Sequence, residues 1–192
     1  LLNFMMKIFF PFPIFVLFFF ATAPVWSDEP KTFGLKNAKA LYDPKKIATS
    51  ETPVANAKIQ QLYKAIESGD LENTKRLQIG IDINFQDRNG ITPLYLSVFH
   101  NQSKLVSYYL LNNADINLAD NDGLAPLHVA GLENLPEMVR LLLDNGAELN
   151  TTDRDGYTPL HIAIDQNSFN AADELLLAGA DVNSRAEWQH TP

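Results

Sequence analysis

Three consecutive stretches of equal length decide the fold: "DRNGITPLYLSVFHNQSKLVSYYLLNNADINLA" (87–119), "DNDGLAPLHVAGLENLPEMVRLLLDNGAELNTT" (120–152) and "DRDGYTPLHIAIDQNSFNAADELLLAGADVNSR" (153–185). In every stretch a glycine is fourth, a proline is seventh, and asparagines are fifteenth and thirty-first. Self-similarity at one fixed period, here 33 positions, indicates a stack of identical supersecondary units. The segment 59–86 follows the same pattern, one position short and without the part around the proline.

Each stretch predicts a tight turn followed by two antiparallel helices. Thr92 and Thr158 can cap the helix after the turn, with a proline at its first position, where no backbone donor is missed. Ala125 breaks this rule. The glycines that give the turns their backbone freedom are Gly90, Gly123 and Gly156. The residues expected in left-handed backbone between the two helices are Asn101, Asn134 and Asn167, with Gly69 in the first unit.

The second helix of each unit carries pairs of leucines that are expected to form its buried stripe. These pairs are Leu110–Leu111, Leu142–Leu143 and Leu175–Leu176. One unit cannot bury such a face alone, so the neighbouring units must cover it.

The chain resembles the ankyrin repeat family over residues 59–192. The motifs that carry the resemblance are "TPLY" at 92, "APLH" at 125 and "TPLH" at 158, with "GIDIN", "NADIN", "GAELN" and "GADVN" near the ends of the units. The resemblance implies an all-α ankyrin-repeat solenoid, built from helix-turn-helix units joined by β-turn loops. It also implies that the histidine of the motif forms hydrogen bonds within and between units.

The expected organisation has seven parts. They are a signal peptide (1–27), a flexible leader (28–53), a capping-type first repeat (54–86), full repeats at 87–119, 120–152 and 153–185, and the start of a truncated repeat (186–192). Thr191 and Pro192 follow Thr158 and Pro159 by one repeat period. Because terminal units normally have a polar outer face, we expect a fragment, a truncated gene or a chain that associates end to end.

The segment 1–27 is typical of a secretory signal peptide. Lys7 precedes an unbroken apolar run from Ile8 to Phe20, and small residues lead to a cleavage site after Ser27. The alternative is an uncleaved anchor, which the prolines in this segment weaken. We therefore expect export from the cytosol, to the periplasm or outside the cell, with no stable membrane anchor after cleavage.

Composition excludes several classes of function. The net charge is −8, and residues 87–185 hold 14 acidic and 5 basic residues, so the chain lacks the cationic surface that nucleic acids require. The absence of cysteine excludes disulfides, thiol catalysis and cysteine-ligated zinc. No cofactor is expected.

Two histidines and four aspartates are the candidates for chemistry. His128 and His161 occupy the same repeat position, which Tyr95 fills one unit earlier, so this position does not require a base. The resemblance implies a structural role for both histidines, and we expect no catalysis. Asp120, Asp122, Asp153 and Asp155 could suggest calcium, but the turns already explain these residues.

The candidate binding surface consists of the turn tips and the exposed side of the first helices. Its residues are Arg88, Ile91, Phe99, Asn121, Leu124, Leu132, Arg154, Tyr157 and Asp165. Exposed apolar groups rimmed by charge mark interaction sites, so we expect Phe99 and Tyr157 to anchor another protein that carries a basic patch. Two alternatives stay open: several apolar members pack against neighbouring turns, or the chain is a remnant of a longer ankyrin protein with no independent function.

Overall fold

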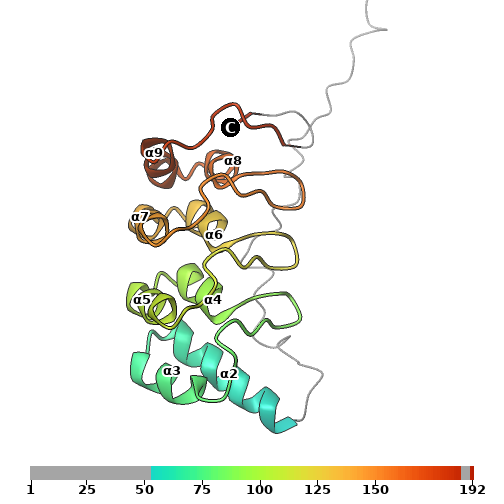
Figure 1. Cartoon of the computed structure of the whole chain (residues 1–192), viewed down its shortest axis with the longest axis vertical. Helices are drawn as coiled ribbons and strands as arrows, with labels where there is room; N and C mark the ends of the chain where they lie inside the picture. Colours follow the sequence, from blue (N-terminus) through green and yellow to red (C-terminus); the bar gives the residue numbers. More distant parts are fainter. Residues whose placement is uncertain (1–52, 187–190) are drawn as a thin grey trace, which may run out of the picture. The chain divides into compact units, whose positions relative to one another are not determined.

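The computed structural model describes residues 53–186 and 191–192 and shows an all-α stack, as the sequence predicts. The predicted signal peptide and residues 28–52 of the predicted leader lie outside the described residues. Four helix pairs follow one another in chain order, each packed on the pair before it (Figure 1). The pairs are α2 (Pro53–Glu67) with α3 (Leu71–Gln78), α4 (Pro93–Phe99) with α5 (Ser103–Leu111), α6 (Pro126–Leu132) with α7 (Pro136–Asp144), and α8 (Pro159–Asp165) with α9 (Phe169–Leu177).

The first helix of each full repeat begins where the capping residues predict. The Thr92 hydroxyl accepts a hydrogen bond from the Tyr95 N–H at 3.0 Å, and prolines occupy the first position of α4, α6 and α8. Ala125 has no hydroxyl to offer α6. Its own N–H donates instead to Nδ1 of His128 at 3.1 Å, which ties the start of this helix to its first turn.

The link between the two helices of a unit is left-handed, as predicted. The linking residues and their φ angles are Gly69 (69°), Asn101 (54°), Asn134 (55°) and Asn167 (57°). In the first unit α3 has 8 residues, against 9 in α5, α7 and α9, so the missing residue of the sequence pattern is lost from the second helix.

Each turn is closed by the aspartate that begins the repeat. Oδ1 of Asp87 accepts the N–H groups of Asn89 and Ile91, both at 2.9 Å, and Asp120 and Asp153 do the same in their turns. Successive turns touch through the backbone, since the Asn121 N–H donates to the Asn89 carbonyl at 2.9 Å. A Cβ at Gly90 would lie 2.6 Å from that Asn121 nitrogen, so this close approach requires glycine.

Asparagine side chains also connect each unit to the next. In three consecutive units an asparagine Oδ1 accepts a backbone N–H from the following unit. These pairs are Asn84 with Asp115 (2.8 Å), Asn117 with Glu148 (2.9 Å) and Asn150 with Asp181 (3.0 Å). The thirty-first position of the repeat is therefore structural.

The predicted leucine stripe of the second helices is partly wrong. Leu142 and Leu175 are fully buried, but Leu111 is exposed, and Tyr109 fills the buried position in α5. Each residue turns the helix by about 100°. Leu110 and Leu111 lie one residue further along the repeat than Leu142 and Leu143. The second leucine of the pair, Leu111, therefore lies on the outside of its helix. Within residues 53–186 and 191–192, we find no helix with the length and apolar character to span a membrane.

Candidate protein-binding surface

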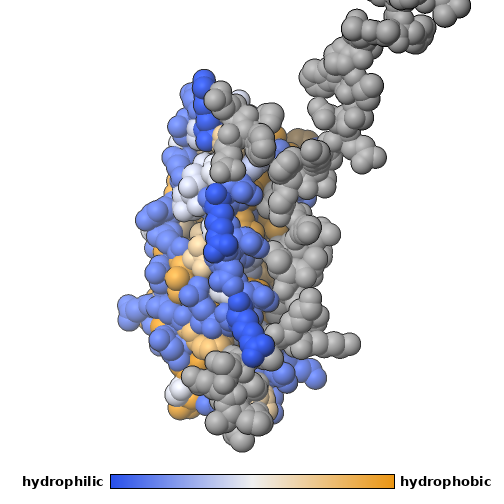
Figure 2. Space-filling model, turned by 90° about the vertical axis from the view of Figure 1, so that its right-hand side faces the viewer, coloured by the Kyte–Doolittle hydropathy of each residue, from blue (hydrophilic) through white to orange (hydrophobic). Residues whose placement is uncertain are grey.

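The tips of the turns form an exposed polar row. Arg88, Asn121 and Arg154 occupy the same turn position in three units, and all three are exposed. The Asn121 side-chain amide donates to the Arg88 carbonyl at 2.6 Å, so the row is held together along the stack. Figure 2 looks onto the side on which the turns lie and shows hydrophilic residues running along it, with apolar patches beside them.

Ile91 and Leu124 do not share this exposure, contrary to the sequence-based expectation. Their side chains are 2% and 4% exposed. Each residue closes the base of its turn: its N–H donates to the first aspartate of the repeat, and its carbonyl accepts the N–H of that same aspartate. The base of the turn packs against the body of the stack, whereas the tip of the turn is exposed. Ile91 and Leu124 are therefore removed from the candidate surface.

Tyr157 holds the same turn position but stays partly exposed. Its ring packs edge-on against the ring of His161, with centroids 5.6 Å apart. Burial, together with the carboxylates of Asp165, Asp153 and Asp155, raises the pKa of the Tyr157 phenol. At neutral pH the residue therefore presents an apolar ring and a neutral hydroxyl that can donate to a partner.

The ends of the first helices form a second row. Phe99, Leu132 and Asp165 are the last residues of α4, α6 and α8; the first two are half-buried and Asp165 is exposed. The Phe99 ring packs edge-on against His100, whose Nε2 lies 4.0 Å from a carboxylate oxygen of Glu67. Burial lowers the pKa of His100, and this carboxylate opposes the change.

His128 is a structural residue that links two units. It is buried, its Nδ1 accepts the Ala125 N–H, and its Nε2 lies 3.0 Å from the Tyr157 carbonyl of the next unit. Because Nδ1 accepts, Nε2 carries the proton and donates. Burial lowers the pKa of His128 to about 4. His161 is also buried, and its Nδ1 lies 3.2 Å from the Thr158 nitrogen, the bond that His128 makes with Ala125.

Two tyrosines provide the equivalent links between the first and second units and between the second and third units. The Tyr63 hydroxyl donates to the Ile91 carbonyl at 2.8 Å, and the Tyr95 hydroxyl donates to Oδ2 of Asp120 at 3.0 Å. The repeat pattern predicted the position of Tyr95 but not that of Tyr63, because the first unit lacks the motif around the proline that marks this position in the other units. The common requirement is a donor aimed at the next turn.

The turn aspartates are occupied by the backbone. Oδ1 of Asp87, Asp120 and Asp153 accepts two N–H groups each, as described above. Among the residues that the structure describes, no group of three or more histidines and carboxylates converges in a way that could hold a metal ion. Seven of the predicted surface residues are at least partly exposed and remain candidates: Arg88, Phe99, Asn121, Leu132, Arg154, Tyr157 and Asp165.

Comparison with known families gives one match. A family model of ankyrin repeats (three copies) matches residues 62–153 and, in a second alignment, residues 110–186. Together the two alignments cover well over half of the chain. No curated protein sequence matches the chain.

Proposed function

The chain belongs to the ankyrin repeat family, whose repeats are non-catalytic protein–protein interaction modules, and from this premise we propose that it captures one partner on its turn tips and first-helix ends. The observation that supports this proposal is the pair of rows described above. Polar tips occur in three units, and half-buried apolar residues end the first helix in two of them. Such a combination of partly exposed apolar groups and a charged rim is typical of interaction surfaces.

The aromatic residues are the proposed anchors. Phe99 and Tyr157 are both half-buried, so each offers ring area to a partner while its position stays fixed by contacts with the stack. Rigid aromatic side chains carry much of the binding free energy in protein interfaces, since they bury a large area at small cost in entropy.

The surrounding charge selects the chemistry of the partner. Asp155 and Asp165 are exposed and lie close enough to Tyr157 to raise its pKa, Asp122 is exposed in the preceding turn, and Glu133, which follows Leu132 in the chain, is half-buried. The seven members of the surface include two arginines, Arg88 and Arg154, and one carboxylate, Asp165. With the neighbouring Asp122, Glu133 and Asp155 counted, carboxylates outnumber guanidinium groups by four to two. We infer that the partner presents a basic patch, because complementary charge speeds association and disfavours other partners.

A double substitution tests the anchors. Phe99→Ala together with Tyr157→Ala should weaken capture of the partner by roughly 30-fold, equivalent to about 2 kcal/mol, with unchanged helicity by circular dichroism. Leu111→Ala with Leu177→Ala is the matched control, because it removes two exposed apolar side chains from the second helices. Unchanged affinity in the anchor variant, or an equal loss in the control, would reject this surface.

We further propose that the protein is exported, with residues 1–27 removed. The support is the sequence pattern of a basic residue, an apolar run and small residues before position 28. Intact mass spectrometry of the protein from its source should give a species that begins at Asp28. A mass that retains residues 1–27 would contradict cleavage and favour an anchor. A chain that shows no cooperative unfolding would instead favour a remnant without independent function.

A further inference from the structure

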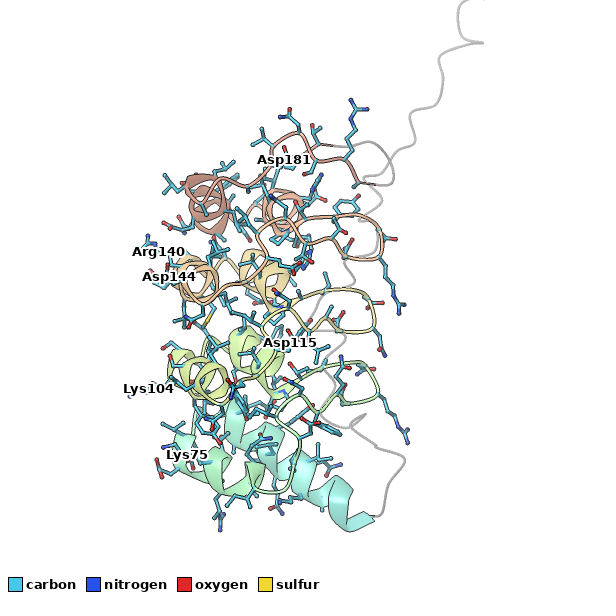
Figure 3. All side chains as sticks on the ribbon, viewed as in Figure 1. Lys75, Lys104, Asp115, Arg140, Asp144 and Asp181 are labelled. Carbon is cyan, nitrogen blue, oxygen red and sulfur yellow. The ribbon has the colours of Figure 1, made fainter. Side chains whose placement is uncertain are left out.

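The second helices present a common set of positions to solvent. Residues three, four and seven apart share one face of an α-helix. At this spacing, the second, fifth, sixth and ninth residues of each second helix, counted from its first residue, are exposed or half-buried in every unit. In α3 the ninth is the C-cap, Ile79. We call these positions the outer helix face. Figure 3 shows four of its members, Lys75, Lys104, Arg140 and Asp144, on the side of the stack opposite the turns.

Charge divides the outer helix face into a lower half, on α3 and α5, and an upper half, on α7 and α9. The lower half has three basic residues and one carboxylate, whereas the upper half has one basic residue and four carboxylates. In the upper half, Arg140 donates to the Glu174 carboxylate through two nitrogens, with Nε to Oε2 at 2.6 Å. The lower half is therefore a positive surface on a chain whose net charge is −8.

The basic residues of the lower half are Lys75, Arg76 and Lys104, and all three are exposed. The Lys75 ammonium pairs with Glu72, at 2.9 Å. The Arg76 guanidinium donates to a neutral side-chain amide at 2.7 Å and so keeps its positive charge. Lys58 of α2 donates to the Ile79 carbonyl, which adds a further ammonium group at the edge of this half.

Two aliphatic side chains protrude among these charges. Ile79 and Leu111 occupy the same helix position in neighbouring units and are 72% and 83% exposed. The half-buried Tyr108 precedes Leu111 by three residues, and its ring packs edge-on against Tyr109. Apolar side chains among lysine and arginine are typical of protein surfaces that lie on membranes, because the apolar groups enter the acyl boundary while the cations meet anionic headgroups.

We propose that the lower half of the outer helix face binds the surface of a membrane that contains anionic lipids. Ile79 and Leu111 enter the boundary between headgroups and acyl chains. Arg76, Lys104 and Lys58 meet the phosphate and carboxylate groups of the lipids. Because a few apolar groups and a few cations hold the protein, the contact is peripheral and reversible.

A lipid surface fits the lower half better than an acidic protein does. Ile79 and Leu111 stand in separate units and are mostly exposed, so a protein partner would need two pockets at the spacing of the repeat. Fluid acyl chains close around protruding side chains without pre-formed pockets. The alkyl stems of lysine and arginine also lie along an apolar boundary while their charged ends stay in water.

Membrane binding by the outer helix face leaves the turns accessible. Figure 1 shows α5, α7 and α9 on one side of the stack and the turns on the other. A protein held through the lower half therefore presents its turn tips away from the membrane. The inference does not rest on the partner proposed for the turn tips.

A fluorophore at a single position tests which half meets the bilayer. The chain has no cysteine, so Leu111→Cys and Leu177→Cys each give one labelling site in the full chain. The two leucines share a repeat position and are 83% and 81% exposed. Vesicles of mixed phosphatidylserine and phosphatidylcholine should shift the emission of an environment-sensitive label to the blue at position 111 and not at position 177. Vesicles of phosphatidylcholine alone should give a much smaller shift. The comparison between positions holds whether residues 1–27 are present or removed.

Charge substitutions test the role of the basic residues. In the chain labelled at position 111, Arg76→Gln together with Lys104→Gln should raise the lipid concentration needed for half of the shift by roughly 30-fold, about fivefold for each charge. Arg88→Gln together with Arg154→Gln is the matched control, because it removes the same charge from the turn tips. This control should leave the lipid concentration unchanged.

Several outcomes overturn the proposal. Equal shifts at positions 111 and 177, or equal shifts with neutral and anionic vesicles, would reject the lower half as a membrane surface. Equal losses in the two charge variants would show a response to net charge alone. A shift at position 111 caused by soluble polyglutamate, with none from anionic vesicles, would assign the surface to an acidic protein.

Discussion

The contacts between neighbouring units use different side chains to donate a hydrogen bond to the next unit. We call the contacts among the first three units the lower joints and the contact between the last two units the upper joint. Tyr63 and Tyr95 connect the first three units through their hydroxyls, whereas His128 connects the last two through its imidazole. The tyrosines donate one hydrogen bond each to the next unit. The histidine donates to the next unit and also accepts an N–H from its own. The repeat position that these three residues share thus needs a side chain that donates a hydrogen bond to the next unit. Only the histidine also accepts a hydrogen bond that fixes the start of its own helix.

This difference has consequences for stability. A tyrosine hydroxyl keeps its proton throughout the pH range in which proteins fold, and burial raises the pKa of Tyr95 further. The imidazole of His128 must stay neutral to accept the Ala125 N–H. The upper joint should therefore be the one that acid weakens, and the one that suffers most when its side chain is removed.

The largest expected effect is that of His128→Ala. This substitution leaves the Ala125 N–H and the Tyr157 carbonyl without their partner and opens a cavity. The free energy of unfolding, measured by urea titration, should fall by roughly 3–5 kcal/mol. The control is His128→Tyr, which can still donate to the next unit and should lose less. Equal losses in the two variants would refute the distinction between the joints.

Mild acid should weaken the upper joint selectively. The folded-state pKa of His128 is about 4, below its value of 6.5 in the unfolded chain. As the pH falls from 6.5 towards 4, the unfolded chain therefore binds a proton that the folded chain does not. The stability that is present above pH 6.5 decreases over this window by up to about 3 kcal/mol.

The aspartates of the turns act in the opposite direction, so the acid effect is best measured as a difference. Burial raises the pKa of Asp87, Asp120 and Asp153, which favours the folded state at low pH. His128→Tyr keeps these groups and removes the imidazole. Wild-type protein should lose more stability than this variant between pH 6.5 and 4. Hydrogen exchange should show faster opening in α6 and α8 than in α4, and equal opening would contradict the selectivity.

A third prediction concerns the space between the first helices. Val98 is buried in α4, but the same position in α6 is Gly131, where a Cβ would lie 2.9 Å from the Pro159 carbonyl oxygen. Gly131→Ala should therefore destabilise the protein by about 1–3 kcal/mol, despite the better helix propensity of alanine. Val98→Ala is the matched change in the lower joint and should cost stability by leaving a cavity. A Gly131→Ala variant more stable than wild type would show that the backbones can move apart.

The sequence predicted the features that local backbone chemistry determines and failed on burial and on the shortened first unit. The repeat period, the left-handed asparagines and the threonine cap of α4 depend on local backbone chemistry, which a sequence displays directly. The burial of Ile91 and Leu124 depends on which way the base of the turn faces, and that is a tertiary property. The exposure of Leu111 was missed because two adjacent leucines do not show by themselves which of the two faces the core. Tyr63 was missed because the first unit lacks the motif around the proline that marks the equivalent position in the other units.

The smallest expected effect is a gain in stability from Ala125→Thr. Thr92 and Thr158 occupy the same position in the neighbouring units, and both are buried there. The backbone of Ala125 has the extended conformation of these two residues, with φ −76° and ψ 163°, so a threonine fits without strain. Its hydroxyl would accept the His128 N–H, as Thr92 accepts that of Tyr95. The unfolding free energy should rise by about 0.5–1 kcal/mol, with no change in helicity. Because His128 already accepts the Ala125 N–H, a gain in the His128→Ala background that exceeds the gain in wild type would show that the cap and the imidazole partly replace each other. Equal gains would show that the two ties to α6 act independently.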